Sequence, residues 1–469
     1  MKKESITISC FAMFLIIAGS IDNIRNLAGT AQSGSYIIFF FVLASIVFLI
    51  PSAMISAYFS SNYTQRGEEG IYGWIKEVFN ADIALFALSC QFLQTFTWYP
   101  AVLAFVAGMI VKLLLPSWSN HLTVLEILIF WLVTYINIMG LATSFRLMKI
   151  FIMLGMVLPM GIILIFGSIW LAQGNPHYAH FTLSNMVPPL TNFSSWTALT
   201  FIITGFTGIE LACVHIRNVR EPRKTFPKAL FSASVFMLIT MVFGAVSIWM
   251  LIPNTSIDAE YGVATAFKLY LHSYHLNWLY PVLLIFIILG TLGQLVNWVL
   301  SPIRAIGYTV KDGYLPKILY KNNKRGVPQN LLILQACIIS IVCLLFSYMP
   351  PNNFMIILTS TGTEVYLGAY FVLFLAMIKL SITKAIKREG FVPKFPLILS
   401  ISGLLGCMLS FCVGFYQPNS VKLLIVNYHL VYISAIVISY SPLLYCYWYK
   451  YRKRHSQYSI NSSSIETQE

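Results

Sequence analysis

Charged residues are scarce in this sequence. Asp, Glu, Lys and Arg together fill 10% of the 469 positions, whereas hydrophobic residues fill 58%. Apolar runs recur from end to end, and one helical crossing of a bilayer takes roughly 20 such residues. The segments between the runs leave no room for a soluble domain. The composition therefore excludes a soluble globular protein and predicts a polytopic membrane protein.

Motifs for metal binding and covalent catalysis are also missing. The eight cysteines lie in or beside apolar runs, without a CxxC pair or a histidine at ligand spacing, and are typical of small buried hydrophobes. No nucleophile stands with its base, so we expect no enzyme, no metal and no cofactor. His215, the one histidine near the candidate site, fits an ordinary helix end as well as a functional group.

Basic residues outnumber acidic ones by 30 to 16, so a nucleic-acid or acidic partner has to be weighed. With both termini in the cytoplasm, all but four of the 30 basic residues fall at cytoplasmic ends of apolar spans. This positive-inside pattern accounts for the charge, and no nucleic-acid partner is expected. The cluster from Lys450 to Arg454 is interpreted as a stop-transfer anchor, with binding to acidic lipids as the alternative.

We predict twelve transmembrane spans in the inner or plasma membrane. They cover about residues 8–29, 36–60, 83–114, 122–142, 147–172, 195–215, 229–252, 277–307, 330–349, 354–378, 397–416 and 426–448. Residues 1–7 then form a cytoplasmic N-terminus, residues 8–449 a single transmembrane domain, and residues 450–469 a polar cytoplasmic tail.

Two spans are interrupted where a lipid-facing helix would not tolerate it. Span one contains the polar octet from Gly19 to Asn26, and span six contains Thr204-Gly-Phe-Thr-Gly208. Free backbone groups and polar side chains are costly in hydrocarbon, so both interruptions indicate a cavity. Asp22 and Arg25, three residues apart, either neutralise each other or contact a ligand.

The interrupted spans open two successive blocks of five spans, about residues 8–172 and 195–378. Because five is odd, the second block enters the membrane from the opposite side, which is the sequence mark of inverted repeats with a binding site near the midplane. Two further spans, about residues 397–448, fall outside the repeat. We therefore predict an all-α fold with 12 transmembrane helices, a 5+5 inverted repeat with broken helices 1 and 6, and two extra C-terminal helices.

Polar side chains also mark spans three and eight. In span three, polar and aromatic residues gather between Gln91 and Pro100 and either line a cavity or contact other helices. In span eight, Gln294, Asn297 and Trp298 lie within about one helical turn. They either face a polar ligand or form hydrogen bonds with neighbouring helices.

Three of the 16 acidic residues lie well inside apolar spans: Asp22, Glu210 and Glu364. Insertion scales assign a charged group at a helix centre a cost of about 2.5 to 3.5 kcal/mol. These acids therefore predict neutralisation, protonation or a water-filled cavity. An acid that is charged in one conformation and neutral in another is what proton coupling requires.

From the sixth span onward, the sequence resembles the amino acid–polyamine–organocation (APC) superfamily. The resemblance rests on Gly205-Phe-Thr-Gly208-Ile-Glu210 and on the basic stretch from Asn218 to Ala229 with its two prolines. Three further motifs resemble the bacterial glutamate:GABA antiporter branch of that superfamily. They are Glu68-Glu-Gly-Ile-Tyr-Gly-Trp74, Trp298 with Ser301-Pro-Ile-Arg304, and Asn323-Lys-Arg-Gly-Val-Pro328.

The resemblance implies a LeuT-like fold in which broken helices 1 and 6 hold the α-carboxylate and α-amine of an amino acid. By position, the resemblance implies that Ile21, Asp22 and Asn23 contact the carboxylate. It implies that the carbonyls of Thr204 and Thr207 contact the amine, in the stretch that also holds Gly205, Phe206 and Gly208. It further implies a substrate-facing aromatic residue at Trp298 and an acid that gates transport with pH at Glu210. The sequence lacks the glycine-serine-glycine of the carboxylate-binding turn. Gln294 stands where the acid-resistance antiporter has a carboxylate.

We therefore expect secondary transport of amino acids by alternating access, as antiport of the glutamate/GABA kind. The expected partners are an amino acid, protons and the lipid bilayer, with Glu210, Asp22 and Glu364 as proton-coupling candidates. Arg25 would complement an acidic substrate side chain if it faces the cavity. Proton-coupled uptake of neutral or cationic amino acids, and an amino acid sensor that does not transport, are the alternatives.

Overall fold

The computed structural model describes residues 9–21, 24–63, 70–140, 150–182, 185–211, 219, 221–347, 351–418, 421 and 427–466. Within these ranges the regular structure is helical, apart from bridge residues at Val219, Asn322 and Pro328, of which the last two pair with each other. Nine of the described helices are long and apolar enough to cross a membrane, and three shorter apolar helices accompany them. All of them overlap the ranges predicted as spans. The chain is an all-helical integral membrane protein.

The first apolar segment is broken. α1 (Cys10–Ile21) ends inside the polar octet, at its third residue, and a short helix, α2 (Asn26–Ala31), begins at its last residue. Asp22 and Asn23 lie outside the described residues, as does His215. The second apolar segment is a continuous run of helical turns. It consists of a 3-10 turn at Gly34–Tyr36, α3 (Ile37–Ala44), a π-helical turn at Ser45–Leu49 and α4 (Ile50–Asn62).

The sixth apolar segment ends inside the glycine-threonine stretch. α11 (Phe193–Trp196) and α12 (Ala198–Phe206) form its first half. Thr207 is extended, with φ −75° and ψ 152°, and Gly208 has φ 95°, a left-handed value that disfavours a side chain. The helical hydrogen bonds therefore stop at the depth where the polar residues gather.

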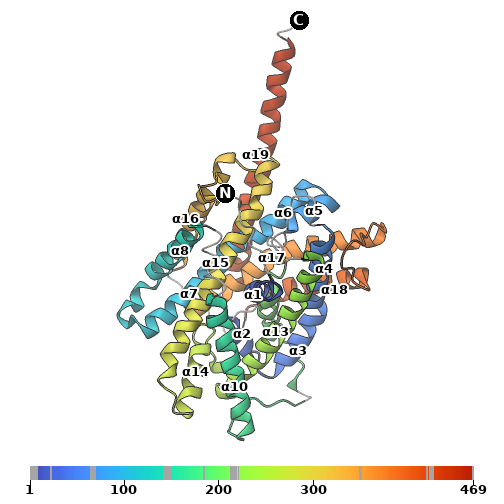
Figure 1. Ribbon diagram of the computed structural model, residues 1–469. Coiled ribbons are helices and arrows are strands. Elements are labelled where there is room, and N and C mark those ends of the chain that lie inside the picture. Colours follow the sequence, from blue (N-terminus) through green and yellow to red (C-terminus); the bar gives the residue numbers. More distant parts are fainter. Residues whose placement is uncertain are drawn as a thin grey trace.

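The remaining helices complete the bundle. They are α5 (Gly70–Val78), α6 (Ala81–Leu93), α7 (Thr95–Leu113), α8 (Leu122–Ile138), the π-helical η5 (Met153–Val157) with α10 (Leu158–Ala172), α13 (Pro222–Leu251), α14 (Gly262–Ser273), α15 (Leu279–Lys311), η9 (Lys317–Tyr320), α16 (Gln329–Phe346), α17 (Pro351–Ile382), α18 (Pro396–Gly414) and α19 (Tyr428–Glu466). The polar tail from residue 450 continues α19 as a helix, which projects from the rest of the molecule (Figure 1).

α17 is the helix around which the others are arranged. It packs against α6, α7, α12, α18 and α19, and it lies near the middle of the molecule (Figure 1). One face of α17 therefore meets the broken sixth segment, and another face meets the two C-terminal helices.

Hydrogen bonds and ion pairs join the helix ends on the side where α4 ends. The Nδ2 atom of Asn62 donates to the carbonyl of Phe391 at 2.9 Å, and the N–H groups of Gly390 and Phe391 donate to the side chains of Asn62 and Ser61. α5 contributes ion pairs from Lys76 to Asp312 (2.7 Å) and from Glu77 to Lys387 (2.5 Å). These contacts tie α4, α5, α15 and the segment between α17 and α18 together.

η5 and α15 cross with their backbones in contact. A Cβ atom added to Gly155 would overlap the backbone of Phe286 and Gly290, and one added to Gly290 would overlap the backbone of Gly155. Because backbone atoms cannot move aside as a flexible side chain can, both positions require glycine.

We expect Gly290→Val to force η5 and α15 apart and to lower the thermal unfolding midpoint by roughly 1–3 °C, since overpacking costs about 1–3 kcal/mol and a chain of 469 residues loses roughly 1 °C per kcal/mol. The measurement is thermal unfolding of the purified protein in detergent. Gly161→Val is the matched control, because nothing lies within 4 Å of a Cβ atom at that position. Equal midpoints for the two variants would contradict the close crossing.

Candidate functional site

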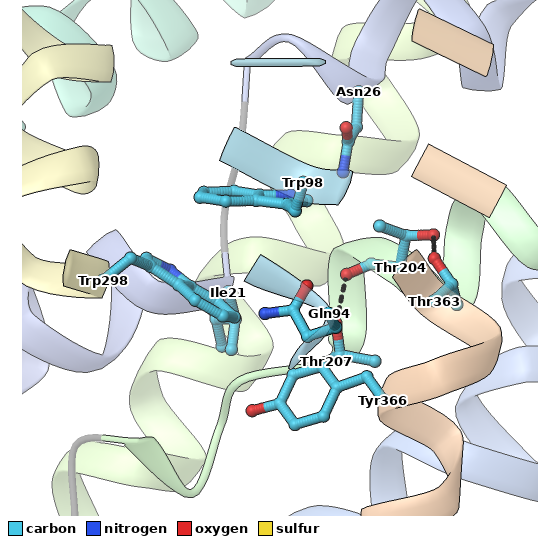
Figure 2. A pocket seen from close by; sticks show the side chains of 9 residues that line it. All are labelled: Ile21, Asn26, Gln94, Trp98, Thr204, Thr207, Trp298, Thr363 and Tyr366. Atoms are coloured by element: carbon cyan, nitrogen blue, oxygen red, sulfur yellow. Dashed lines mark hydrogen bonds between the residues drawn. The ribbon is translucent and has the colours of Figure 1, made fainter. Parts of the chain in front are cut away.

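A polar pocket lies where the two broken segments meet α17. Its lining combines hydroxyl and amide groups with aromatic rings from five parts of the fold (Figure 2). The lining residues are Ile21, Asn26, Gln94, Trp98, Thr204, Thr207, Trp298, Thr363 and Tyr366. We call this the central pocket. Its volume of about 10 Å³ is at the limit of what one water molecule needs, so the pocket has no room for an amino acid as it stands.

The broken helices bring free backbone groups to the central pocket. Ile21 is the last residue of α1, Asn26 is the first of α2, and Thr207 follows the end of α12. The last carbonyls of a helix have no partner within it, and a helix end also carries a partial charge. The side chains of Thr204 and Thr363 bond each other across the pocket, which links α12 to α17.

Aromatic rings form one wall of the central pocket. The rings of Trp98 and Trp298 are stacked with centroids 4.7 Å apart, and Tyr366 meets Trp298 edge-on at 6.1 Å. The Tyr99 hydroxyl donates to the carbonyl of Trp298 at 2.8 Å and fixes the backbone there. The two tryptophans come from α7 and α15, so a change in the distance between these helices alters the pocket directly.

Gln94 was absent from the site residues inferred from the sequence. It lies in the turn between α6 and α7, and its amide points into the central pocket (Figure 2). Its side chain is buried, and its Nε2 atom has no hydrogen-bond partner among the described residues. An unsatisfied buried donor is costly, so a group that accepts from Gln94 would be stabilised here. In the sequence, the cluster of polar residues in span three was the feature that indicated a possible cavity wall at this position.

Arg25 is fully buried beside the pocket rather than in its lining. Its guanidinium lies 5.7 Å from the ring centroid of Trp98, and its Nη1 atom donates to Thr359 at 3.3 Å. The positive charge therefore acts on the pocket through an aromatic ring, which is attracted to cations.

Glu210 lies one side chain away from the central pocket. Its carboxylate accepts from the Nε2 atom of Gln91 at 2.7 Å and from the hydroxyls of Tyr366 and Tyr370. The Tyr370 hydroxyl in turn accepts from the N–H of Gly208 at 2.9 Å. Three donors on one carboxyl group suit the ionised form, because a protonated acid would need one of these groups as an acceptor.

Other residues inferred from the sequence point elsewhere. Glu364 follows Thr363 in the chain but faces α18, where the Ser410 hydroxyl donates to it at 3.4 Å. The Nε2 atom of Gln294 donates to the sulfur of Met156 at 3.6 Å, and the Phe206 ring lies 6.0 Å from that of Phe41. Asn297, Gly205 and Gly208 are also absent from the pocket lining.

A second cavity, of about 270 Å³, lies between α2 and α12. Gly29, Ser33, Thr197 and Phe201 contribute to its lining. The Phe201 ring packs on Gly29, one turn along each helix from the residues that line the central pocket. This ring therefore separates the two cavities.

Long apolar helices around a small polar pocket define an integral membrane protein of the kind that includes transporters. A model of the amino acid permease family matches residues 8–440. The chain belongs to this family, whose members are transporters and not enzymes.

Individual relatives are similar over most of the chain. An uncharacterized transporter of Legionella pneumophila is 27% identical over 431 residues, covering 90% of this chain and 92% of the relative. A glutamate/gamma-aminobutyrate antiporter of Lactococcus lactis is 24% identical over 426 residues (88% and 84%). A probable agmatine/putrescine antiporter of the same species is 20% identical over 382 residues (79% of each chain).

Two buried acids outside the central pocket were not singled out from the sequence. Glu126 in α8 and Glu260 before α14 are 7% and 2% exposed. Burial raises the pKa of Glu260 to about 7, with the Tyr261 hydroxyl opposing the shift and the carboxylates of Asp258 and Glu126 adding to it. Glu260 also packs on α7 at Gly108, so it holds the α14 segment against that helix.

Protonated Glu260 should stabilise the fold. Its folded pKa of about 7 exceeds the ordinary value of 4.5, so this stability is complete below pH 4.5 and is lost as the pH rises through 7. The loss corresponds to about 3 kcal/mol at most. We expect Glu260→Gln to unfold at a midpoint that changes less between pH 5 and pH 8 than that of the wild type. Glu221→Gln, at an exposed acid, is the control. An unchanged pH slope in Glu260→Gln would contradict this assignment.

Proposed function

We propose that this chain transports amino acids across the inner or plasma membrane by alternating access, as an antiporter. The observation that supports this proposal most is the small central pocket between the ends of two broken helices. A site too small for its substrate has to open, and broken helices provide both the free backbone groups and the hinge.

The proposed architecture has twelve spans with both termini in the cytoplasm. Residues 8–172 and 195–378 form two inverted repeats of five spans, and residues 397–448 form two extra helices. The positions of α1 with α2 and of α12 support the repeat, because the breaks open corresponding blocks. The basic residues at the proposed cytoplasmic ends support the orientation.

The backbone of the substrate is proposed to bind at the two breaks. N–H groups after Ile21, with Asp22 and Asn23, would receive the α-carboxylate. The carbonyls of Thr204 and Thr207, at the negative end of α12, would receive the ammonium group. Gly205 and Gly208 would let the backbone approach the substrate closely.

The side chain of the substrate would meet the other wall. Trp298, stacked on Trp98, would cover an aliphatic chain, and the free Nε2 donor of Gln94 would favour a side chain with an oxygen acceptor. Arg25 beside Trp98 would favour negative charge further. Gln294, Asn297 and Phe206 are proposed to shape the pocket from behind its lining.

Glu210 is the proposed proton-coupling acid. Protonation would convert one of the tyrosine hydroxyls that donate to it into an acceptor. Because Tyr366 lines the central pocket, this rearrangement would reach the substrate within one side chain. Glu364, on another face of α17, is a second candidate, and Asp22 is a third.

Two of the relatives are named as antiporters, and they support exchange over simple uptake. They are the glutamate/gamma-aminobutyrate antiporter and the probable agmatine/putrescine antiporter. The substrates in these two names differ in charge. The relatives therefore support exchange as the mechanism and do not point to a particular amino acid. Proton-coupled uptake and a sensor that does not transport are the competing functions.

Reconstituted liposomes distinguish these functions. We expect radiolabelled amino acid to enter vesicles preloaded with unlabelled amino acid and to remain outside empty vesicles. Equal uptake into empty vesicles under an inward proton gradient would establish proton-coupled uptake instead. Binding without flux in either preparation would establish a sensor. A panel of competing amino acids, measured in the same vesicles, identifies the substrate.

Glu210→Gln should flatten the pH dependence of the exchange rate, because the amide cannot titrate between pH 5 and pH 8. Glu364→Gln is the matched comparison, with the same chemical change on a face of α17 turned away from the pocket. We expect it to retain the pH profile of the wild type. A flat profile in Glu364→Gln together with an unchanged one in Glu210→Gln would move proton coupling to Glu364.

A further inference from the structure

An apolar groove lies between α6, α15, α16 and α19, away from the central pocket. Its volume is about 200 Å³, and leucines from all sides of it, including Leu88, Leu331 and Leu443, form its walls. Leu334 and Tyr445 also line it and are 41% and 48% exposed, so the groove opens at these residues to the surface of the molecule. We call it the acyl groove, for the occupant inferred below from its walls and surroundings.

The acyl groove lies in one half of the bundle. Its lining residues run along α6 from Leu85 to Leu93 and reach Phe96 of α7, and the others come from the first half of α16, from the end of α15 and the segment after it, and from the stretch of α19 just before Lys450. This is the half where the basic residues gather, which the proposed topology places at the cytoplasmic leaflet. The groove is therefore at the depth of the acyl chains of a single leaflet.

Water is a poor occupant of this groove. A buried water needs two to four polar partners, and an apolar cavity that is large enough for water still stays dry. The Thr309 hydroxyl, one of the few polar groups in the lining, already donates to the carbonyl of Ile306 at 2.7 Å. The mouth opens among membrane-spanning helices, where the available apolar material is the hydrocarbon chain of a lipid.

Two exposed lysines lie on the segment that lines one side of the groove. Leu315 and Leu319 of the lining flank Lys317, which is exposed, and Lys321 follows on the same exposed segment. The nearest acidic residue along this segment, Asp312, is already paired with Lys76 at 2.7 Å. Among the residues that the structure describes, Lys317 and Lys321 have no ion pair, so a phosphate headgroup that reaches this segment would meet two positive charges.

A neighbouring lysine is neutralised in contrast. Lys450 lies 2.9 Å from Asp82 and donates to the hydroxyl of Tyr314, which also bonds Asp82. Asp82 thus offsets the charge of Lys450. The positive charge available beside Leu315 and Leu319 of the lining belongs to Lys317 and Lys321.

We propose that the acyl groove binds one hydrocarbon chain of an anionic phospholipid from the cytoplasmic leaflet, with the headgroup phosphate on Lys317 and Lys321. The apolar walls select a lipid chain, and the two lysines select the headgroup. The site is independent of the amino acid pathway, so it stands or falls separately from the proposed transport function.

Native mass spectrometry of the full chain tests the site. The purified protein is incubated with phosphatidylglycerol and phosphatidylcholine of identical acyl chains. We expect a retained lipid with a preference for phosphatidylglycerol of roughly fivefold for each lysine, the effect typical of a basic residue near an anionic headgroup. Equal retention of the two lipids by the wild type would overturn the proposal.

Substitutions in the groove and at the lysines test separately how the hydrocarbon chain and the headgroup of the lipid contribute to binding. Leu334→Trp fills the mouth of the groove and should lose the retained lipid, whereas Leu344→Trp, at an exposed leucine (54%) ten residues further along α16, should keep it. The double variant Lys317→Gln with Lys321→Gln should keep a lipid but lose the preference. Unchanged retention in Leu334→Trp would contradict binding in the groove.

A measurement on the wild type covers the case in which a variant fails to fold. Phosphatidylglycerol with a photoreactive group in its acyl chain is crosslinked to the protein, and the labelled peptides are identified. Labels on the lining segments of α6, α16 or α19 support the site. Labels confined to other helices would overturn it.

Discussion

The carboxylate of Glu210 is the contact on which the central part of this molecule depends. It is 1% exposed in the interior of a membrane protein, where an unsatisfied acid would be costly, and three donors surround it. The donors come from α6 and α17, while the acid itself follows the end of α12. The broken sixth segment is therefore held against two other helices by one side chain. The positions of Thr204, Thr207 and Tyr366 around the pocket follow from that attachment.

The aromatic side chains extend this arrangement across the pocket. Tyr366 bonds the acid and faces Trp298, whose ring is stacked on Trp98, and Arg25 lies beyond Trp98. A charge at each end of this row of rings is thus buried next to a lining residue without itself lining the pocket. Such a layout keeps the pocket neutral and polar, while changes at either charge still reach it through rings in contact.

Much of the fold follows from the sequence, because apolar length and helix-breaking residues are local properties. The ranges of the apolar helices and the two interruptions could be predicted in this way, although α12 continues to Phe206, past the first glycine of its break. The direction in which a polar residue points depends instead on how helices rotate against each other. Glu364 and Gln294 were therefore inferred as site residues but face Ser410 and Met156, whereas Gln94 faces the pocket and was not inferred.

The hydrogen bonds from Ser61 and Asn62 to Gly390 and Phe391 bear on kinetics rather than on binding. They attach the end of α4 to the segment that joins α17 and α18. Any motion of α4 relative to α17 has to break these bonds before it can form new ones, so they contribute to the height of an energy barrier. Breaking several hydrogen bonds in one step gives a large activation enthalpy. A conformational cycle that includes this step slows steeply on cooling, even when the affinity for the substrate is unchanged.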